Sequence, residues 1–256
     1  MVLTLVQYSA TDEASRKATL LLDVRPDGRI SLALRLIDVP QTRRRRAVLG
    51  ELAAAAAASA RAPTLCFDLS FGELMNDGER VALARQLALC YGYNRTLSLP
   101  FQLSLAGLSD ARQSGVSAVL AQWNWEQWSV MREEASGCDV YAGRRDVVYL
   151  SSESPDALEA VESGTVYVIG GLVDHTCKEG VTQRLAAGSG VRTARLPLEH
   201  FVTVRKPALT CLAVVQIMAG FVHTASWERA VREAPAMNCA PLKKYVRWKP
   251  AGGHAR

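Results

Sequence analysis

The sequence lacks closely spaced cysteines. Its six cysteines are separated by at least twenty-four positions, whereas zinc knuckles and redox dithiols place two cysteines within a few residues of each other. The spacing therefore predicts no metal site of this kind. Most of these cysteines lie in apolar runs, where a free thiol behaves as a small buried hydrophobic residue, and this indicates a reducing compartment.

Long apolar runs are absent as well. No stretch of eighteen or more apolar residues occurs, so the sequence predicts no membrane-spanning helix. The first twenty residues contain Asp12 and Glu13 and lack the apolar core of a secretory signal, so we expect no targeting peptide. We expect a nuclear or cytoplasmic location and leave a mitochondrial one open. The 256 residues, 49% of them apolar, suffice for one packed domain with appendages.

Neither end of the chain carries an excess of acidic residues, and both ends are basic. Residues 1–62 carry ten Lys or Arg against six acidic residues, and residues 240–256 carry five against none. The stretch between them has fifteen basic and nineteen acidic residues. Basic ends on a mildly acidic body indicate a protein that holds a polyanion outside its central region. The alternative is that the basic ends only improve solubility.

The first sixty residues predict an appendage. Residues 19–39 are typical of a β-hairpin with Pro26, Asp27 and Gly28 at its turn. Four arginines and a run of alanines follow, and they predict a helix over residues 42–61 that ends before Pro63.

Strands and helices alternate from residue 64 onward, which predicts an α/β fold with a mostly parallel sheet covered on both faces. In such sheets ligands bind beyond the carboxyl ends of the strands. Pro100 places its segment at a sheet edge or at a strand start, and the segment 122–135 resists assignment. The expected strands are 64–70, 97–107, 147–152, 165–171 and 191–197. The expected helices are one capped by Asn76 or Asp77 and ending near 92, 110–121, a short one opened by Ser154-Pro155, 209–222, and a short one from about Ser226.

The stretch VYVIGGLVDH contains the most unusual turn. It lacks the third glycine and the following helix of a dinucleotide fingerprint, and Lys178 is not in a P-loop context. Glycines at a strand end let main-chain groups approach a ligand, which suits an adenine or a ribose, and Asp174 adds a charge. The alternative is a tight turn in which Asp174 bonds its own backbone, and the residues alone favour it slightly.

Several polar and aromatic residues admit two interpretations each. Asp68 lies in an apolar strand, where an unpaired carboxylate is costly, so it is held by loop amides or lies near a substrate. Gln86 is a surface residue or part of a site. Arg95 binds phosphate or complements the end of its helix. The tryptophans at 123, 125 and 128 either stack on a nucleobase or cover the core, and the second interpretation is favoured about two to one.

Four stretches together resemble a known family: CFDLSFGELMNDGERVALARQLALCYGYNR, PFQLSLAGL, VVYLSSESPDALEAVESGTVYVIGGLVDHTCKEGVT and GVRTARLPLEHF. They are similar to the SPOUT-class tRNA methyltransferases that modify N1 of the purine at tRNA position 9. The resemblance covers residues 63–235 in the same order and at similar spacing. It implies an enzyme that uses S-adenosylmethionine, and a SPOUT fold with a trefoil knot in its C-terminal half, an exception to the rule against threaded chains.

The resemblance also assigns site residues. Asp174 matches an acid proposed as the catalytic base, which fits the chemistry because N1 of guanine carries a proton that must leave, whereas N1 of adenine has a free lone pair. Asp68 and Gln86 match further polar residues of the proposed catalytic site. The implied cofactor contacts are Leu150, Gly170, Asp174, His175, Thr176, Cys177, Lys178, Thr182, Leu196, Ala208, Leu209 and Thr210.

These inferences give a layout with an N-terminal appendage (1–62), a methyltransferase domain (63–235) and a basic tail (236–256). The family works as a monomer on tRNA, and we expect guanine to be the preferred purine and no metal to be required. Two alternatives stay open: a non-catalytic tRNA-binding subunit of a processing complex, and a SPOUT methyltransferase acting on another RNA. The expected RNA-binding residues are Arg43, Arg44, Arg45, Arg46, Arg95, Lys243, Lys244, Arg247 and Lys249.

Overall fold

The computed structural model describes residues 7–8, 18–24, 30–36, 62–173, 181–204, 209–239, 243 and 246–249. Near the N-terminus, β1 (Gln7–Tyr8), β2 (Ala18–Val24) and β3 (Ile30–Leu36) form an antiparallel sheet. β2 and β3 pair along their whole length, so the hairpin predicted at 19–39 is confirmed. The helix predicted at 42–61 lies outside the described residues.

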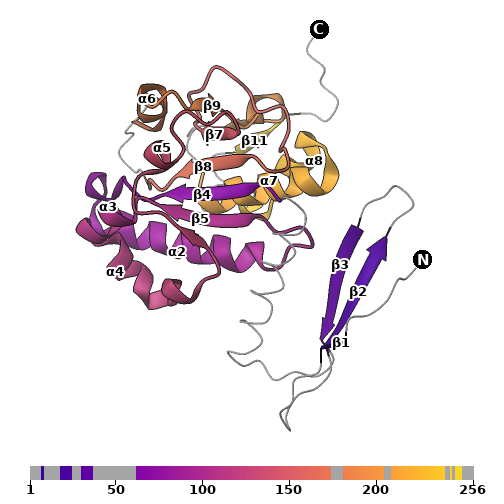
Figure 1. Ribbon diagram of the computed structural model, residues 1–256. Helices are drawn as coiled ribbons and strands as arrows, with labels where there is room; N and C mark the ends of the chain where they lie inside the picture. Colours follow the sequence, from indigo (N-terminus) through magenta and orange to yellow (C-terminus); the bar gives the residue numbers. More distant parts are fainter. Residues whose placement is uncertain are drawn as a thin grey trace.

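A six-stranded parallel sheet forms the centre of the remaining chain (Figure 1). Its order is β6-β5-β4-β8-β7-β9, and all neighbours run parallel, which confirms the predicted mostly parallel sheet. Pro100 precedes β5 by two residues, so it stands at a strand start rather than on an edge strand. The strands are β4 (Thr64–Asp68), β5 (Gln102–Ala106), β6 (Met131–Arg132), β7 (Val147–Leu150), β8 (Val166–Gly170) and β9 (Arg192–Ala194).

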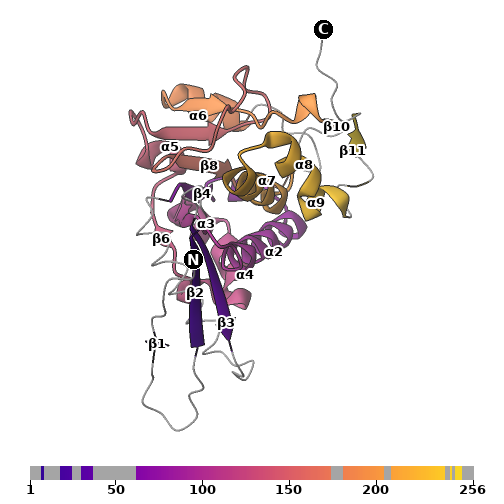
Figure 2. The ribbon, with the colours of Figure 1, turned by 90° about the vertical axis from the view of Figure 1, so that its right-hand side faces the viewer.

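Helices cover both faces of this sheet (Figures 1 and 2). α5 (Gly137–Val140) and α6 (Val181–Gly188) lie on one side, and α2 (Asp77–Asn94) and α7 (Cys211–Thr224) lie on the other. The period-two alternation of β4 explains the two layers. Leu65 and Phe67 belong to the core beneath α2 and α7, whereas Cys66 belongs to a second core with Tyr149 and Val168.

Helix α2 forms because its start is capped and one face is apolar. The Asn76 side chain accepts from the main-chain N–H of Glu79, and the Glu79 carboxylate accepts from Asn76 N–H, each over 3.0 Å. This reciprocal capping box satisfies two N–H groups that a helix start leaves free. Leu83 and Leu87 are buried on its apolar face, and the predicted helix and its cap are confirmed.

The single helix predicted at 110–121 is wrong, because a glycine divides it. The chain forms α3 (Leu108–Gln113) and α4 (Val116–Leu120). Gly115 between them has a φ of 81°, a left-handed conformation that interrupts an α-helix. Two short 3-10 turns, Ala121–Trp123 and Trp125–Gln127, follow in the stretch that resisted assignment.

The short helix predicted to open at Ser154-Pro155 is wrong as well. Main-chain groups of this segment bond to the chain after β9 instead of to one another: Leu158 N–H donates to Arg195 O, and Arg195 N–H donates to Asp156 O, each over 2.8 Å. The Arg195 guanidinium also donates to the carbonyl oxygens of Ser154 and Pro155. These bonds hold the segment against the chain after β9, where Ala157 and Arg195 form an isolated bridge, and tertiary contacts override the sequence signal for a helix start.

The last part of the described chain adds helices and an antiparallel strand pair. α8 (Trp227–Glu233) begins after Ser226, where a short helix was predicted to start, and the Ser226 side chain caps it. β11 (Val246–Trp248) pairs with β10 (Val202–Val204), so part of the predicted basic tail forms a strand against the domain. Within the described residues, no helix is both long and apolar enough to cross a membrane. Other short elements were not predicted, among them η1 (Gly72–Leu74), η4 (Leu198–His200) and α9 (Pro235–Asn238).

Candidate functional site

The carboxyl ends of three adjacent strands bring predicted site residues together. Asp68 ends β4 and pairs with Gly170, the last residue of β8. Leu150 ends β7 and pairs with Ile169. Asp68 was predicted to be catalytic, and Leu150 and Gly170 were predicted to contact the cofactor. All three lie at the carboxyl edge of the sheet, where parallel sheets bind ligands.

The glycine turn after β8 rests directly on the end of β4. Gly171 N–H donates to Asp68 O over 2.7 Å. A Cβ at position 171 would lie 2.6 Å from the same oxygen, which is closer than any side chain tolerates. Glycine is therefore required here by the close approach of two main chains. Two residues later, Val173 N–H donates to the Met75 sulfur over 3.4 Å, so the described start of the loop is anchored at both ends.

The Asp68 side chain is buried and hydrogen-bonded. Its Oδ1 accepts from Ser70 N–H and its Oδ2 accepts from the Tyr149 hydroxyl, each over 3.2 Å. Burial raises the pKa of the Asp68 carboxyl above its ordinary value of 3.8, and hydrogen bonds from Ser70, the Gly137 main chain and Tyr149 oppose that rise. Of the two interpretations of Asp68, the structure shows the loop amide, and it adds a tyrosine from another strand.

Gln86 links α2 to the start of α7. Its Oε1 accepts from Cys211 N–H over 2.8 Å. A main-chain N–H can only donate, so the amide oxygen of Gln86 is identified and occupied. The adjacent Thr210 caps α7 by accepting from Ala213 N–H over 3.2 Å. Gln86 thus holds the helix that begins directly after the predicted cofactor residues Leu209 and Thr210, and its neutral amide is not a base that could take a substrate proton.

The remaining predicted cofactor residues divide into described and undescribed ones. Leu196 follows β9 and is nearly buried, and β9 pairs with β7 so that Ala194 lies opposite Leu150. Thr182 belongs to α6. Asp174, His175, Thr176, Cys177, Lys178 and Ala208 lie outside the described residues.

The predicted RNA-binding residues that the structure describes lie on separate elements. Arg95 follows α2, and its guanidinium lies 5.4 Å from the centre of the Tyr91 ring. Lys243 and Arg247 are exposed, and Lys249 Nζ donates to Glu199 O over 2.6 Å. Arg43, Arg44, Arg45, Arg46 and Lys244 lie outside the described residues.

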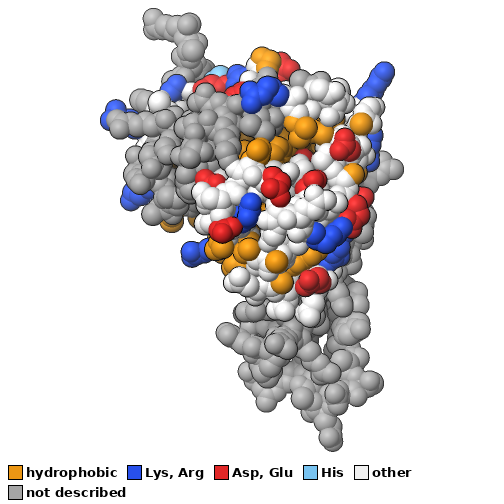
Figure 3. All heavy atoms as spheres, turned by 90° about the vertical axis from the view of Figure 1, so that its left-hand side faces the viewer, with side chains coloured by type: hydrophobic (Ala, Val, Ile, Leu, Met, Phe, Trp, Pro, Cys, Tyr) orange, Lys and Arg blue, Asp and Glu red, His pale blue; other side chains and the backbone are white. Residues whose placement is uncertain are grey.

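The face at the carboxyl edge carries charges of both signs. Figure 3 views the molecule from the side to which the arrowheads of β4 and β5 point in Figure 1. Apolar side chains gather in the upper part of this face, and acidic and basic side chains are interspersed over the rest of its described surface. The described part of this face therefore has no extended patch of one charge sign.

The tryptophans cover the core. Trp125 and Trp128 are buried, and Trp128 stacks on Tyr91 with ring centres 4.6 Å apart. The interpretation as a core-covering patch is therefore confirmed. Four of the five described cysteines are buried, and Cys239 is exposed. Among the described residues, no group of His, Cys, Asp and Glu side chains could hold a metal ion.

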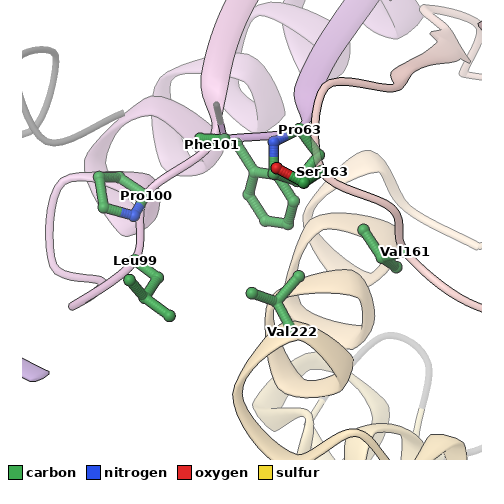
Figure 4. Close-up of a pocket in the computed structure, with 8 residues that line it drawn as sticks. Pro63, Leu99, Pro100, Phe101, Val161, Ser163 and Val222 are labelled. Carbon is green, nitrogen blue, oxygen red and sulfur yellow. The ribbon is translucent and has the colours of Figure 1, made fainter. Parts of the chain in front are cut away.

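A cavity that sequence analysis missed lies at the opposite edge of the sheet (Figure 4). Pro63, Phe101 and Ser163 come before or at the starts of β4, β5 and β8, and the Phe101 ring points into the space beside Val222 of α7. The cavity has a volume of about 190 Å³ and no charged lining residue. Its only sequence signals are prolines before strands. The lining residues are Ala62, Pro63, Leu99, Pro100, Phe101, Val161, Ser163 and Val222.

Comparisons with known proteins bear on this site. A family model described as tRNA (guanine(9)-N(1))-methyltransferase TRM10/TRM10A matches residues 35–236. The chain is 33% identical over 168 residues to rat tRNA methyltransferase 10 homolog A, covering 65% of this chain and 49% of the relative. It is 32% identical over 207 residues to mouse tRNA methyltransferase 10 homolog B, covering 75% and 61%. The chain thus spans about half to three-fifths of the length of these curated relatives.

Solved structures of Trm10 proteins have a similar fold. Full-length spTrm10 in complex with SAH is 25% identical, with a TM-score of 0.57 over 67% of this chain and 94% of that one. A dual-specific Trm10 from Thermococcus kodakaraensis is 18% identical, with a TM-score of 0.51 over 67% of this chain and 99% of that one, and this likeness concerns the fold alone.

Proposed function

The chain belongs to the tRNA (guanine(9)-N(1))-methyltransferase TRM10/TRM10A family, and from this premise we propose that it methylates N1 of the purine at position 9 of tRNA, with S-adenosylmethionine as the methyl donor. The observation that carries the proposal is the family match over residues 35–236, which includes the whole carboxyl edge of the sheet. Guanine is the preferred purine in this proposal, because two fungal relatives are named tRNA (guanine(9)-N1)-methyltransferase.

The described residues at the carboxyl edge suit the donor. Gly170 and Gly171 offer main chain without side chains, and Leu150 and Leu196 offer apolar surface at the ends of the neighbouring strands. An adenine needs such a combination of main-chain polar groups and apolar walls. Leu209 and Thr210 precede α7, which Gln86 holds in place. We assign these residues, together with Asp174, His175, Thr176, Cys177, Lys178, Thr182 and Ala208, to the donor site.

When bound, S-adenosylmethionine supplies a methyl group on a positively charged sulfur. The chain's own task is then to orient the purine, exclude water and remove the proton from guanine N1. Among the predicted catalytic residues, Gln86 is a neutral amide that holds α7, and Asp68 is buried with both oxygens bonded. Asp174 follows the anchored glycine turn, and we assign it the role of proton acceptor.

The base role of Asp174 predicts a difference between substrates. Asp174→Asn removes the proton acceptor, so single-turnover methylation of a tRNA with guanine at position 9 should fall about a hundredfold or more. Methylation of the same tRNA with adenine at position 9 should fall much less, because adenine N1 carries no proton. Equal losses on the two tRNAs would contradict the base role.

tRNA is the partner in this proposal, and we propose that the protein acts as a monomer. Arg43, Arg44, Arg45, Arg46, Arg95, Lys243, Lys244, Arg247 and Lys249 are assigned to tRNA phosphates, which would make binding depend on salt. We also propose that the C-terminal half carries the trefoil knot that its family resemblance implies. Incubation with total RNA and the donor, followed by nucleoside sequencing, tests the function: 1-methylguanosine at tRNA position 9 is expected, and methylation of another RNA or none at all would overturn it.

A further inference from the structure

Tyr149 is a buried polar residue to which the proposed function assigns no role. It lies in the middle of β7 and is fully buried. Its hydroxyl donates to Asp68 Oδ2 over 3.2 Å, a bond between residues 81 positions apart in the sequence. Burial raises the pKa of Tyr149 well above its ordinary value of 10, so the phenol keeps its proton and remains a donor.

Asp68 is enclosed by neutral groups. The Ser70 N–H donates to its Oδ1 over 3.2 Å, and Gly137 packs so closely that an added Cβ would lie 3.1 Å from Oδ2. Within the described residues, no Lys or Arg forms a salt bridge with it. A buried carboxyl without a cationic partner depends on its hydrogen bonds, so loss of the Tyr149 hydroxyl would remove one of the bonds that hold it.

The main chain of Asp68 carries the glycine turn. Its carbonyl oxygen accepts from Gly171 N–H over 2.7 Å, and its neighbour Leu69 donates to Ala106 O over 2.9 Å. The backbone of Ser70 lies against Gly107, where an added Cβ would be 2.6 Å from Ser70 N. A side chain fixed at both oxygens therefore fixes the main chain on which Gly171 rests.

We propose that Tyr149 and Asp68 form a buried positioning pair that sets the glycine turn of the donor site, and that Asp68 acts through this turn instead of taking the substrate proton. The inference rests on the proposed function, because it concerns the same site. Asp68 is fully buried, and the Ser70 amide, the Tyr149 hydroxyl and the Gly137 main chain surround its carboxyl, which leaves it poorly placed to take a proton from a purine. The first effect of disturbing the pair should therefore fall on donor binding.

The test compares two buried tyrosines on neighbouring strands. Tyr149→Phe removes the hydroxyl that holds Asp68. Tyr167→Phe removes a matched hydroxyl on β8, which accepts from Glu162 N–H over 2.7 Å near the amino end of that strand. The dissociation constant of S-adenosylmethionine is measured by calorimetry, and thermal unfolding is followed for each variant. Y149F should weaken donor binding about tenfold, whereas Y167F should lower the unfolding temperature similarly and leave binding within about twofold.

Asp68→Asn separates positioning from proton transfer. For a positioning residue, D68N weakens donor binding and lowers single-turnover methylation of guanine-9 and adenine-9 tRNAs by the same factor. Adding Y149F to D68N then gives little further loss, because the two side chains act as one unit. The inference is overturned if D68N spares donor affinity and the adenine substrate while abolishing guanine methylation, or if Y149F and Y167F affect donor binding alike. A wild-type protein that binds the donor but methylates no tRNA purine would refute the proposed function and leave the donor-binding comparison intact.

Discussion

The two edges of the central sheet differ in chemistry although the same strands form both. At the carboxyl edge, Asp68, Gly170 and Gly171 bring a buried carboxyl and bare main chain together. At the amino edge, Pro63 and Phe101 line an apolar cavity without charged groups. Buried polar groups at the amino edge serve the fold: Asn94 bonds both the N–H and the carbonyl oxygen of Phe101, each over 2.9 Å.

This difference separates stability from function. Polar groups at the amino edge form hydrogen bonds with one another, so a substitution there should change the free energy of unfolding. Polar groups at the carboxyl edge hold a turn that leads out of the sheet, so a change there should act on ligand binding as well. Substitutions at the two edges can therefore break or sharpen the comparison.

The largest effect is expected for Gly171→Ala. The added Cβ would meet Asp68 O at 2.6 Å, and because both partners are main chain, the turn must move. Donor affinity measured by calorimetry should fall about a hundredfold, at the upper end of overpacking costs. Gly92→Ala is the control, since apart from its own helix backbone and chain neighbours no atom lies within 4 Å of its added Cβ. It should leave affinity unchanged and stabilise α2 by about 0.5–1 kcal/mol; a G171A protein with normal affinity would remove the carboxyl edge from the donor site.

A smaller effect, on stability alone, is expected for Asn94→Ala. The substitution leaves two buried main-chain groups of Phe101 without partners, which should lower the free energy of unfolding by about 3 kcal/mol. Urea denaturation measures this loss. Donor affinity of the folded variant should stay within about twofold of wild type, and a large loss of affinity would show that the two edges are coupled.

The smallest effect concerns the pH dependence of stability. Burial raises the pKa of Asp68 above its ordinary value of 3.8, so the folded protein holds this proton more tightly than the unfolded chain. The resulting stability is fully present below about pH 3.8 and is lost as pH rises through the folded pKa. D68N cannot ionise, so the stability of wild type relative to D68N should decline with rising pH, by at most about 1.4 kcal/mol per pH unit.

The groups that face Asp68 allow this signal to be assigned. Burial raises the pKa of Cys66 to about 12 and that of Cys138 to about 11, and the Tyr149 phenol also stays neutral. None of them titrates between pH 3 and 8. Urea denaturation over this range should show the decline for wild type against D68N. A difference that rises with pH would mean that the folded pKa of Asp68 is lowered.

Sequence patterns predicted the parts of the fold that local physics determines. The strand β4 and the capped helix α2 follow from apolar periodicity and an Asn-x-x-Glu start, and both were located closely. The helix expected at Ser154-Pro155 failed because Arg195, forty residues on, bonds the carbonyls of that segment. The break at Gly115 was missed because a helical periodicity does not report the left-handed φ of 81° that this glycine adopts.

The individual residues of the candidate site were predicted, but their spatial arrangement and hydrogen-bond partners were not. The resemblance named Asp68 and Gln86 without their partners, and the structure supplies Tyr149 and Cys211, which are 81 and 125 positions away. Such contacts arise from strand order, which no local pattern contains. The apolar cavity at the amino edge was not predicted for the same reason, because its lining residues come from separate segments of the chain.

The central claim is that the carboxyl edge serves methylation of a tRNA purine at position 9, and site-specific methyl transfer tests it most directly. Purified protein is incubated with labelled S-adenosylmethionine and one tRNA transcript carrying guanine, or in a second reaction uracil, at position 9. The account predicts one methyl group per guanine-9 transcript, located at N1 of that base, and none on the uracil-9 transcript. Equal incorporation into both transcripts, or no incorporation into either, would contradict it.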